Sequence, residues 1–399
     1  GTPPAVSAHA SWIPHSAFRI PHSGGIPPAV SAHASWIPHS ALRIPHSGGT
    51  PPAVSAHASL LLGTDSTEKA RADPTALPAG RPTTELPTRS AARRITAMLG
   101  RIRTVSMLLV GLWLVGGLLL WIGQGRHNRL SLDLDAQYPP GQPFQPGEIF
   151  ASTLIALMDH ELHDGFGWRP NDFVLWGPTL WADDNANRQL GILQAVRESV
   201  RVFKDHLTKV SSNEYDPDLL EADTLFRNDA TKLWFPSAES RISRGIDRLH
   251  AYIAGLHDGS QRSRPITTRN VELIRLFQAW TDLLGDAHAN LYKDREADGS
   301  SVWWHTDDYF YHAQGYAHAL HALMQALKRE YHQLLSVKPV MQELFDETIL
   351  ALGKAAEMNP WVILNGSPSG LLANHRHNLD IHLIEARQKM YSIREELEK

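Results

Sequence analysis

The chain has 399 residues, a net charge of −4 and no cysteine. The lack of cysteine excludes disulfides, thiolate catalysis and cysteine-ligated zinc or iron–sulfur sites. An acidic balance with no long basic stripe argues against nucleic acid as a partner. The hydrophobic fraction of 42% and the charged fraction of 20% are ordinary for globular proteins, so we expect a sizeable core.

Residues 1–59 consist of tandem repeats. Residues 2–25 and 26–49 are copies of one 24-residue unit that differ at two positions, and a third copy stops at Ser59. Each unit contains a Pro-Pro pair, two Ile-Pro-His-Ser blocks and a Gly-Gly pair, which prevent helices or strands of useful length. Because few large apolar residues remain, we expect disorder in 1–59 and not a stacked repeat array.

The near identity of the copies has two interpretations. One is a gene model that starts too early, through a tandem DNA repeat, with translation beginning near Met98. The other is a genuine disordered extension on the cytoplasmic side. Residues 60–103 are rich in Pro, Thr, Ala and Arg and show no apolar period, so we predict a disordered linker there.

Residues 104–125 form a charge-free run of 22 residues with an apolar core. An α-helix needs about 20 such residues to cross about 30 Å of hydrocarbon, so the run predicts a transmembrane helix. A cleaved signal peptide is the alternative, but its apolar core usually has about 7–15 residues and ends in a small-x-small site, whereas this core ends in Trp-Ile. The predicted membrane-spanning residues include Met107, Trp113, Gly117 and Ile122.

The charges on either side of this run are unequal. Only Arg126 and Arg129 follow it before the acidic residues begin, whereas five arginines lie just before it, within residues 89–103. The side with more positive charge usually stays in the cytoplasm. We therefore expect a cytoplasmic N-terminus and a C-terminal part on the far side of the membrane. The five preceding arginines are Arg89, Arg93, Arg94, Arg101 and Arg103.

Residues 126–147 are rich in Pro and Gly and are predicted to be an extended stalk. After it, apolar residues recur at helical spacing, and no run combines strict alternation with β-branched residues. We therefore predict that 148–399 is one all-α domain, a helical bundle of about seven or eight helices. The predicted helices are Gly147–Asp164, Asn187–Ser211, Asp216–Phe226, Ser237–Gly259, Thr268–Asp294, Asp307 or Asp308 to Leu335, Pro339–Met358 and Leu371–Leu397.

Two long connections, Gly165–Ala186 and Asn359–Gly370, are predicted to be non-helical and rich in tryptophan. Loops of this length in a compact domain tend to be functional or disordered. They either cover the ends of the bundle or form a binding surface. The candidate binding-loop residues are Trp168, Trp176, Trp181 and Trp361.

Several separated blocks of sequence resemble one bacterial family. These blocks are HELHDGFGWRPNDF at 160–173, WFPSAES at 234–240, DDYFYHAQGYAHALHAL at 307–323 and ILNG…LLANH at 363–375. They resemble, in the same order, the family known as domain of unknown function 2333. The resemblance implies a single-span inner-membrane protein of Gram-negative bacteria, with no established activity, cofactor or catalytic residues. The repeats lie outside it.

Histidine and aspartate cluster in three places, which raises the question of a metal site. His160 and His163 lie in DHELHD, where the spacing of three differs from the spacing of four in HExxH zinc sites. Asp308 and His312 are four apart and share a helix face. The third cluster comprises His375, His377, Asp380 and His382. The weak metal candidates are therefore His160, His163, Asp308 and His312; capping, surface or core histidines are the alternative interpretation.

The sequence contains no G-x-S-x-G, P-loop or dinucleotide motif, so we expect no cofactor and no enzyme of those classes. The preferred hypothesis is a membrane-anchored envelope protein whose periplasmic helical domain binds other envelope components. Its partners are then the lipid bilayer and other envelope proteins. A membrane-tethered, metal-dependent enzyme and a small-molecule or lipid sensor remain the alternatives.

Overall fold

The structure is a computed structural model. It describes residues 89–127, 132–139, 141–171, 179–208, 214–259, 262–267, 269–293, 295–360, 363 and 374–399. These residues form eleven α-helices, a π-helical segment and a 3-10 segment, without a strand, so the all-α prediction is confirmed for the part of the chain described. The repeats at 1–59, and the predicted linker up to residue 88, lie outside it.

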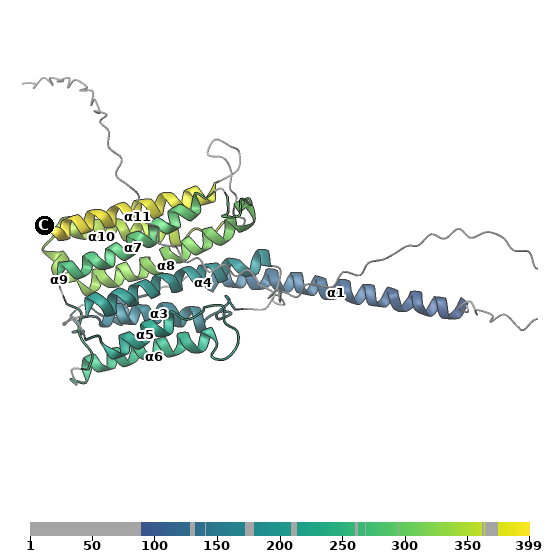
Figure 1. Cartoon of the computed structure of the whole chain (residues 1–399), viewed down its shortest axis with the longest axis horizontal. Coiled ribbons are helices and arrows are strands. Elements are labelled where there is room, and N and C mark those ends of the chain that lie inside the picture. The colour runs from purple at the N-terminus through teal and green to yellow at the C-terminus, as the bar shows by residue number, and fades with distance from the viewer. Residues whose placement is uncertain are drawn as a thin grey trace, which may run out of the picture. The chain divides into compact units, whose positions relative to one another are not determined.

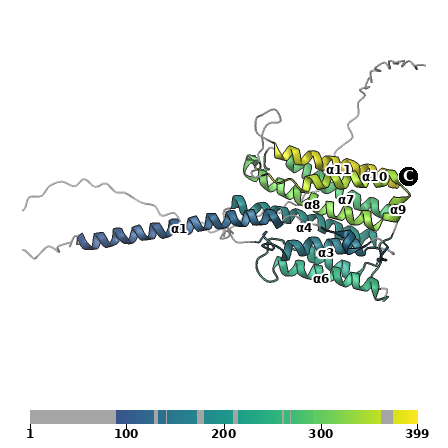
Figure 2. The same cartoon turned by 180° about the vertical axis from the view of Figure 1, so that it is seen from behind.

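The helices of the domain lie side by side with their axes roughly aligned (Figures 1 and 2). We call the end of the bundle where α3 ends and α4 and α8 begin the proximal end, and the opposite end the distal end. The helix bounds are α1 Arg89–His127, α2 Leu134–Gln137, α3 Glu148–His163, α4 Thr179–Val202, α5 Pro217–Phe226, α6 Ala238–His257, α7 Asn270–Leu291, α8 Thr306–Glu330, α9 His332–Ser336, α10 Pro339–Ala356 and α11 His375–Glu398; η2 is Phe203–Leu207 and η3 is Val302–His305.

Helix α1 is longer than the predicted membrane span. It begins at Arg89, inside the segment 60–103 that was predicted to be an unstructured linker. The last proline before it is Pro87, and the residues that follow are mostly Ala, Arg, Leu and Met, which are good helix formers. Once the apolar segment nucleates a helix, such residues extend it at little cost.

Helix α8 lies at the centre of the bundle and contacts α3, α4, α7, α10 and α11. It packs closely on α4, and one glycine in each of the two helices lets their backbones come into contact. A Cβ on Gly191 would lie 2.1 Å from the carbonyl oxygen of His312, and a Cβ on Gly315 would lie 2.2 Å from that of Arg188. Both distances are too short for a side chain, so this helix crossing requires glycine at both positions.

Edge-to-face aromatic pairs fill the core on both sides of this crossing. Phe203 packs against Phe150 and Tyr252, with ring centroids 5.2 Å apart in each pair. On the other side, Phe277 packs against Trp280 at 5.8 Å and Phe345 at 5.7 Å. All six belong to one continuous core of buried side chains. Edge-to-face pairs add about 0.5–1.5 kcal/mol each beyond their burial.

Two predicted helix starts are confirmed by their capping geometry. Asp216 accepts hydrogen bonds from the backbone N–H groups of Asp218 and Leu219 at the start of α5. Ser237 accepts one from Ser240 at the start of α6. The sequence also predicts Asp307 or Asp308 as the N-cap that starts α8, and this was wrong, because the 3-10 turn η3 leads directly into the helix and places His305 at the cap. Asp307 and Asp308 instead lie in the first turn, where the helix dipole favours acidic side chains.

Three other boundaries differ from those predicted. Helix α4 begins at Thr179, so about the last third of the predicted loop Gly165–Ala186 is helical. The predicted helix to Leu335 is divided after Glu330 into α8 and α9, which gives nine helices in the described part of 148–399. Part of the predicted stalk 126–147 packs on the bundle, because Leu134 and Tyr138 are buried against Ile149 and Ala326.

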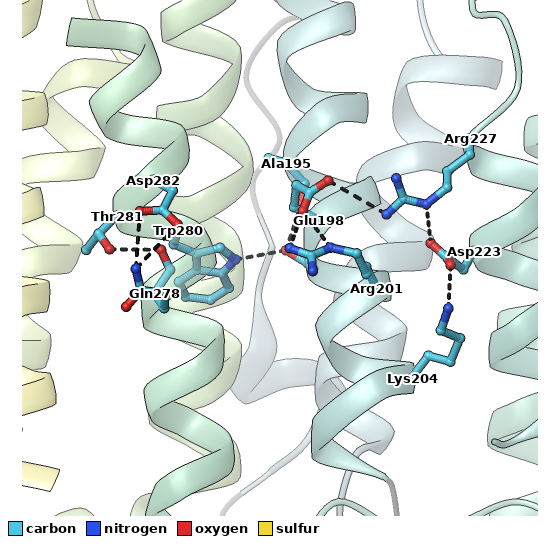
Figure 3. A network of polar contacts seen from close by, with 11 residues as sticks. Ala195, Glu198, Arg201, Lys204, Asp223, Arg227, Gln278, Trp280, Thr281 and Asp282 are labelled. Atoms are coloured by element: carbon cyan, nitrogen blue, oxygen red, sulfur yellow. Dashed lines mark hydrogen bonds and ion pairs between the residues drawn. The ribbon is translucent and has the colours of Figure 1, made fainter. Parts of the chain in front are cut away.

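Polar contacts connect α4 with the helices on either side (Figure 3). Trp280 of α7 donates to the hydroxyl of Ser199 at 2.9 Å, and this hydroxyl donates to the carbonyl of Ala195 at 2.7 Å. On the opposite face of α4, a chain of ion pairs, partly exposed at its arginines and buried at Asp223, leads to α5. Its members are Arg201, Glu198, Arg227, Asp223 and Lys204.

Candidate functional site

Four aspartates gather at the proximal end of the bundle, where α4 and α8 begin side by side. Asp183 and Asp184 come from the first turns of α4, and Asp307 and Asp308 from the first turn of α8. Carboxylate oxygens of Asp183, Asp184 and Asp307 all lie within 4.8 Å of one another. We call these four residues the acid cluster.

Neighbouring side chains hold the acid cluster in place. The amide of Asn187, one turn after Asp183 on α4, donates to Oδ1 of Asp308 at 2.5 Å. Trp121 of α1 donates from Nε1 to Oδ2 of Asp184 at 3.2 Å, and the phenol of Tyr311 also hydrogen-bonds Asp184. The cluster is therefore the place where α1, α4 and α8 meet.

Burial and mutual repulsion raise the pKa values of three of these carboxyls. Burial, with the nearby charges of Asp307 and Asp183, raises the pKa of Asp184 to about 8. Burial and the charges of Asp308 and Asp307 raise the pKa of Asp183 to about 7. Burial and Asp307 raise the pKa of Asp308 to about 6, although His305 and Asn187 act in the opposite direction.

This geometry can do two things chemically. With pKa values near neutrality, the carboxyls of Asp183 and Asp184 can take up or release protons at physiological pH. Oxygen ligands from two helices are also the donors that Mg²⁺ and Ca²⁺ prefer, so Asp183, Asp184 and Asp307 could hold such a cation. Oδ1 of Asp183 is buried and has no hydrogen-bond partner among the described residues, which fits a proton or a cation at this atom.

The metal candidates predicted from sequence occupy other places. His160 Nδ1 lies 2.7 Å from Asp164 Oδ2, and His163 Nδ1 lies 2.8 Å from Asp159 Oδ1, so both pair one turn apart at the end of α3. His312 packs edge-to-face with Tyr316, and burial lowers the pKa of His312 to about 4. Among the described residues, Asp308 is the one predicted candidate that belongs to the acid cluster.

Two residues of the third predicted cluster, Asp380 and His377, make separate contacts. The carboxylate of Asp380 is fully buried and lies 2.9 Å from Nδ1 of His288 on α7. His377 Nδ1 lies 2.6 Å from the phenol of Tyr292. These contacts join the start of α11 to the end of α7, so the described geometry gives them a structural role in this pair of helices.

The predicted binding-loop tryptophans are only partly described. Trp168 is 4% exposed and donates to the carbonyl of Ala230 at 2.9 Å, so it packs the proximal end. Trp181 falls within α4, but its side chain lies outside the described residues, as do Trp176 and Trp361. Their role in binding stays a prediction.

The Glu in the DHELHD sequence has a partner that sequence reasoning missed. Glu161 forms a bidentate ion pair with Nη2 of Arg188, with distances of 2.9 and 2.7 Å. Both side chains are 3% exposed. Nε of Arg188 also donates to Asn185, the residue next to Asp184, at 3.1 Å. The buried pair therefore fixes the turn of α4 that carries the acid cluster.

The acid cluster itself carried a weak sequence signal that was missed. Two Asp-Asp pairs stand at 183–184 and 307–308, each near the start of a helix. Their meeting depends on the glycine-mediated contact between α4 and α8, which the sequence pattern does not reveal.

We expect Asp184→Asn to change the pH dependence of stability. A carboxyl whose pKa is raised on folding binds its proton more tightly in the folded state, so wild-type stability falls as pH rises from about 4 to about 8. Asparagine keeps the oxygen that accepts from Trp121 and removes the charge. At pH 8 the free energy of unfolding should rise by at least about 1.4 kcal/mol, the equivalent of one pKa unit.

Thermal melts of the full chain in detergent with EDTA, from pH 5 to pH 8 in steps, measure this effect. Asp247→Asn, at an exposed position on α6, is the matched control and should leave the profile unchanged. Identical profiles for D184N and wild type would contradict the account. Added Mg²⁺ or Ca²⁺ tests for cation binding, because a bound cation raises the melting temperature of the wild type and not of D184N.

Comparison with known proteins adds one family match. Residues 104–399 match DUF2333, a family of uncharacterized proteins conserved in bacteria, and this confirms the resemblance noted in the sequence. No curated protein and no solved structure matches the chain. The match includes α3–α11 and the apolar part of α1. Because it covers well over half of the chain, this protein belongs to the DUF2333 family.

Proposed function

We propose that the protein is a single-pass membrane protein that holds its helical domain on the periplasmic side of the bacterial inner membrane. The observation that carries the proposal is the exposure of α1. Thr96–Gly123 is long and apolar enough to cross a bilayer, and only 6% of its most apolar window is buried in the structure. A soluble protein would bury such a stripe against its core.

The length of α1 fits this role. At about 1.5 Å per residue, the 28 residues Thr96–Gly123 extend for about 42 Å, enough for about 30 Å of hydrocarbon and both interfaces. Arg101 and Arg103 lie towards the N-terminal end, where long basic side chains reach the headgroups. Trp121 lies near the other end, at the level where aromatic residues prefer the interface.

The orientation rests on charge. Five arginines within residues 89–103 lie just before the apolar segment and two lie just after it, which favours a cytoplasmic N-terminus. The domain is then periplasmic, and the absence of cysteine is compatible with an oxidising compartment.

Extraction of bacterial membranes with alkaline carbonate tests the membrane part of the proposal. The full chain should stay with the lipid and require detergent for release. Release by carbonate alone would overturn the proposal, because it would show a peripheral association.

We also propose that the domain acts by binding other proteins of the envelope and not by catalysis. The support is the sequence, which lacks nucleotide and nucleophile motifs while tethering a large folded domain to the membrane. Crosslinking in intact cells tests it. The same envelope protein should be recovered with the wild-type chain and lost when residues 148–399 are exchanged for an unrelated periplasmic domain; equal recovery from both would count against it.

A further inference from the structure

The connection between α5 and α6 carries two aromatic side chains into solvent. Trp234 is 78% exposed and Phe235 is 96% exposed, and Leu233 beside them is 43% exposed. Large aromatic side chains are rarely left this open on a soluble surface unless they contact something. We call Leu233, Trp234 and Phe235 the aromatic tip.

Hydrogen bonds hold the base of the aromatic tip. The indole of Trp168 donates to the carbonyl of Ala230 at 2.9 Å. The amide of Asn171 donates to the carbonyl of Lys232 at 3.3 Å and to the carboxylate of Glu239 at 2.9 Å. The connection is thus fastened on both sides of the tip, and its aromatic side chains remain directed outwards.

The aromatic tip lies at the end of the bundle to which α1 is attached. The α5–α6 connection is at the proximal end, beside the end of α3 (Figures 1 and 2). Phe166, two residues before Trp168, packs on Gly123 of α1 so closely that a Cβ there would lie 2.9 Å from its ring. Trp121, two residues before Gly123 on α1, donates a hydrogen bond to Asp184 at the same end of the bundle.

The membrane-spanning part of α1 ends where α1 contacts the domain, so the aromatic tip cannot lie far from the bilayer. The last apolar residues of α1 already contact the domain, and part of the predicted stalk packs on the bundle instead of acting as a spacer. Whatever covers the aromatic tip must therefore fit close to the membrane surface.

From these contacts we infer that the aromatic tip inserts into the interfacial layer of the bilayer that α1 spans. It forms a second attachment of the domain to the membrane. Tryptophan and phenylalanine are the residues that favour this layer. The inference rests on the proposed function, because it requires α1 to span the membrane.

The chain offers a direct test, because it contains no native cysteine. Three single-cysteine variants of the full chain, F235C, V337C and L112C, each carry a nitroxide spin label and are reconstituted into phosphatidylethanolamine and phosphatidylglycerol vesicles. Val337 is the matched control, since it is 74% exposed but lies at the distal end between α9 and α10. Leu112 lies within α1 and reports on the span itself.

For each spin label, the rate of collision with oxygen, which concentrates in lipid, is compared with the rate of collision with a water-soluble nickel chelate. We expect the label at 235 to be at least about threefold less accessible to the chelate than the label at 337, and accessible to oxygen. Equal chelate accessibility at 235 and 337, with the label at 112 in lipid, would overturn the inference and leave the proposed function intact. An aqueous label at 112 would overturn both.

Occupants other than lipid give different spectra. If a second copy of the chain covers the tip, labels at 235 approach one another and their spectra broaden by spin–spin coupling. If a protein surface covers it, the label is immobilised and shielded from both oxygen and chelate. Either result would overturn the inference of lipid contact.

Discussion

Replacing Leu112 and Val115 by arginine is expected to abolish membrane insertion. Both side chains are exposed and lie near the middle of the apolar part of α1. Each arginine costs about 2.5–3.5 kcal/mol at the centre of a spanning helix, and each lost aliphatic side chain removes a further favourable contribution, so the pair costs about 6–8 kcal/mol. Flotation of cell membranes through a density gradient measures the result, because inserted chains float and soluble or aggregated chains do not.

The double alanine variant, L112A/V115A, is the control for this experiment. Alanine shortens the same side chains without adding charge, so this variant should float with the membranes like the wild type. If L112R/V115R also floats with the membranes, α1 does not span the bilayer.

Glu161→Ala is expected to destabilise the domain strongly. The substitution leaves the guanidinium of Arg188 buried without its carboxylate, and Arg188 Nη1 already lacks a hydrogen-bond partner among the described residues. Removing one member of a buried ion pair typically costs about 3–5 kcal/mol. Chemical denaturation of the full chain in detergent measures the change in the free energy of unfolding.

Glu198→Ala is the matched control, since Glu198 pairs with Arg201 at the bundle surface (Figure 3). Loss of a partly exposed pair should cost about 1 kcal/mol or less. An E161A variant that is no less stable than E198A would contradict the assignment of Glu161 and Arg188 as a buried pair.

Helices whose boundaries depend on local chemistry were predictable from the sequence. Asp216 followed by Pro217, and Ser237 before an apolar period, indicated helix starts that the structure confirms. The start of α4 was missed because Trp181 and the Asp-rich residues after it are weak helix formers. Its first turns make long-range contacts, among them the hydrogen bond from Trp121 to Asp184, which no local pattern predicts.

The candidate site was harder to predict because its residues are far apart in the chain. Asp184 and Asp307 are separated by more than 100 residues and meet only because Gly191 and Gly315 allow close backbone contact. The sequence indicated histidines as possible metal ligands, yet His160 and His163 pair with nearby carboxylates at the end of α3. The exposure of Trp234 and Phe235 likewise depends on tertiary packing, since aromatic residues in a sequence are usually assigned to the core.

A pair of fusions at Lys399 tests the central claim most directly, namely that α1 carries the domain across the inner membrane. Alkaline phosphatase is active only in the periplasm. Green fluorescent protein fluoresces in the cytoplasm but stays dark when it is exported in the unfolded state. The account predicts an active phosphatase fusion and a dark fluorescent fusion, and loss of phosphatase activity in L112R/V115R. An inactive phosphatase fusion together with a bright fluorescent fusion of the wild-type chain would contradict it.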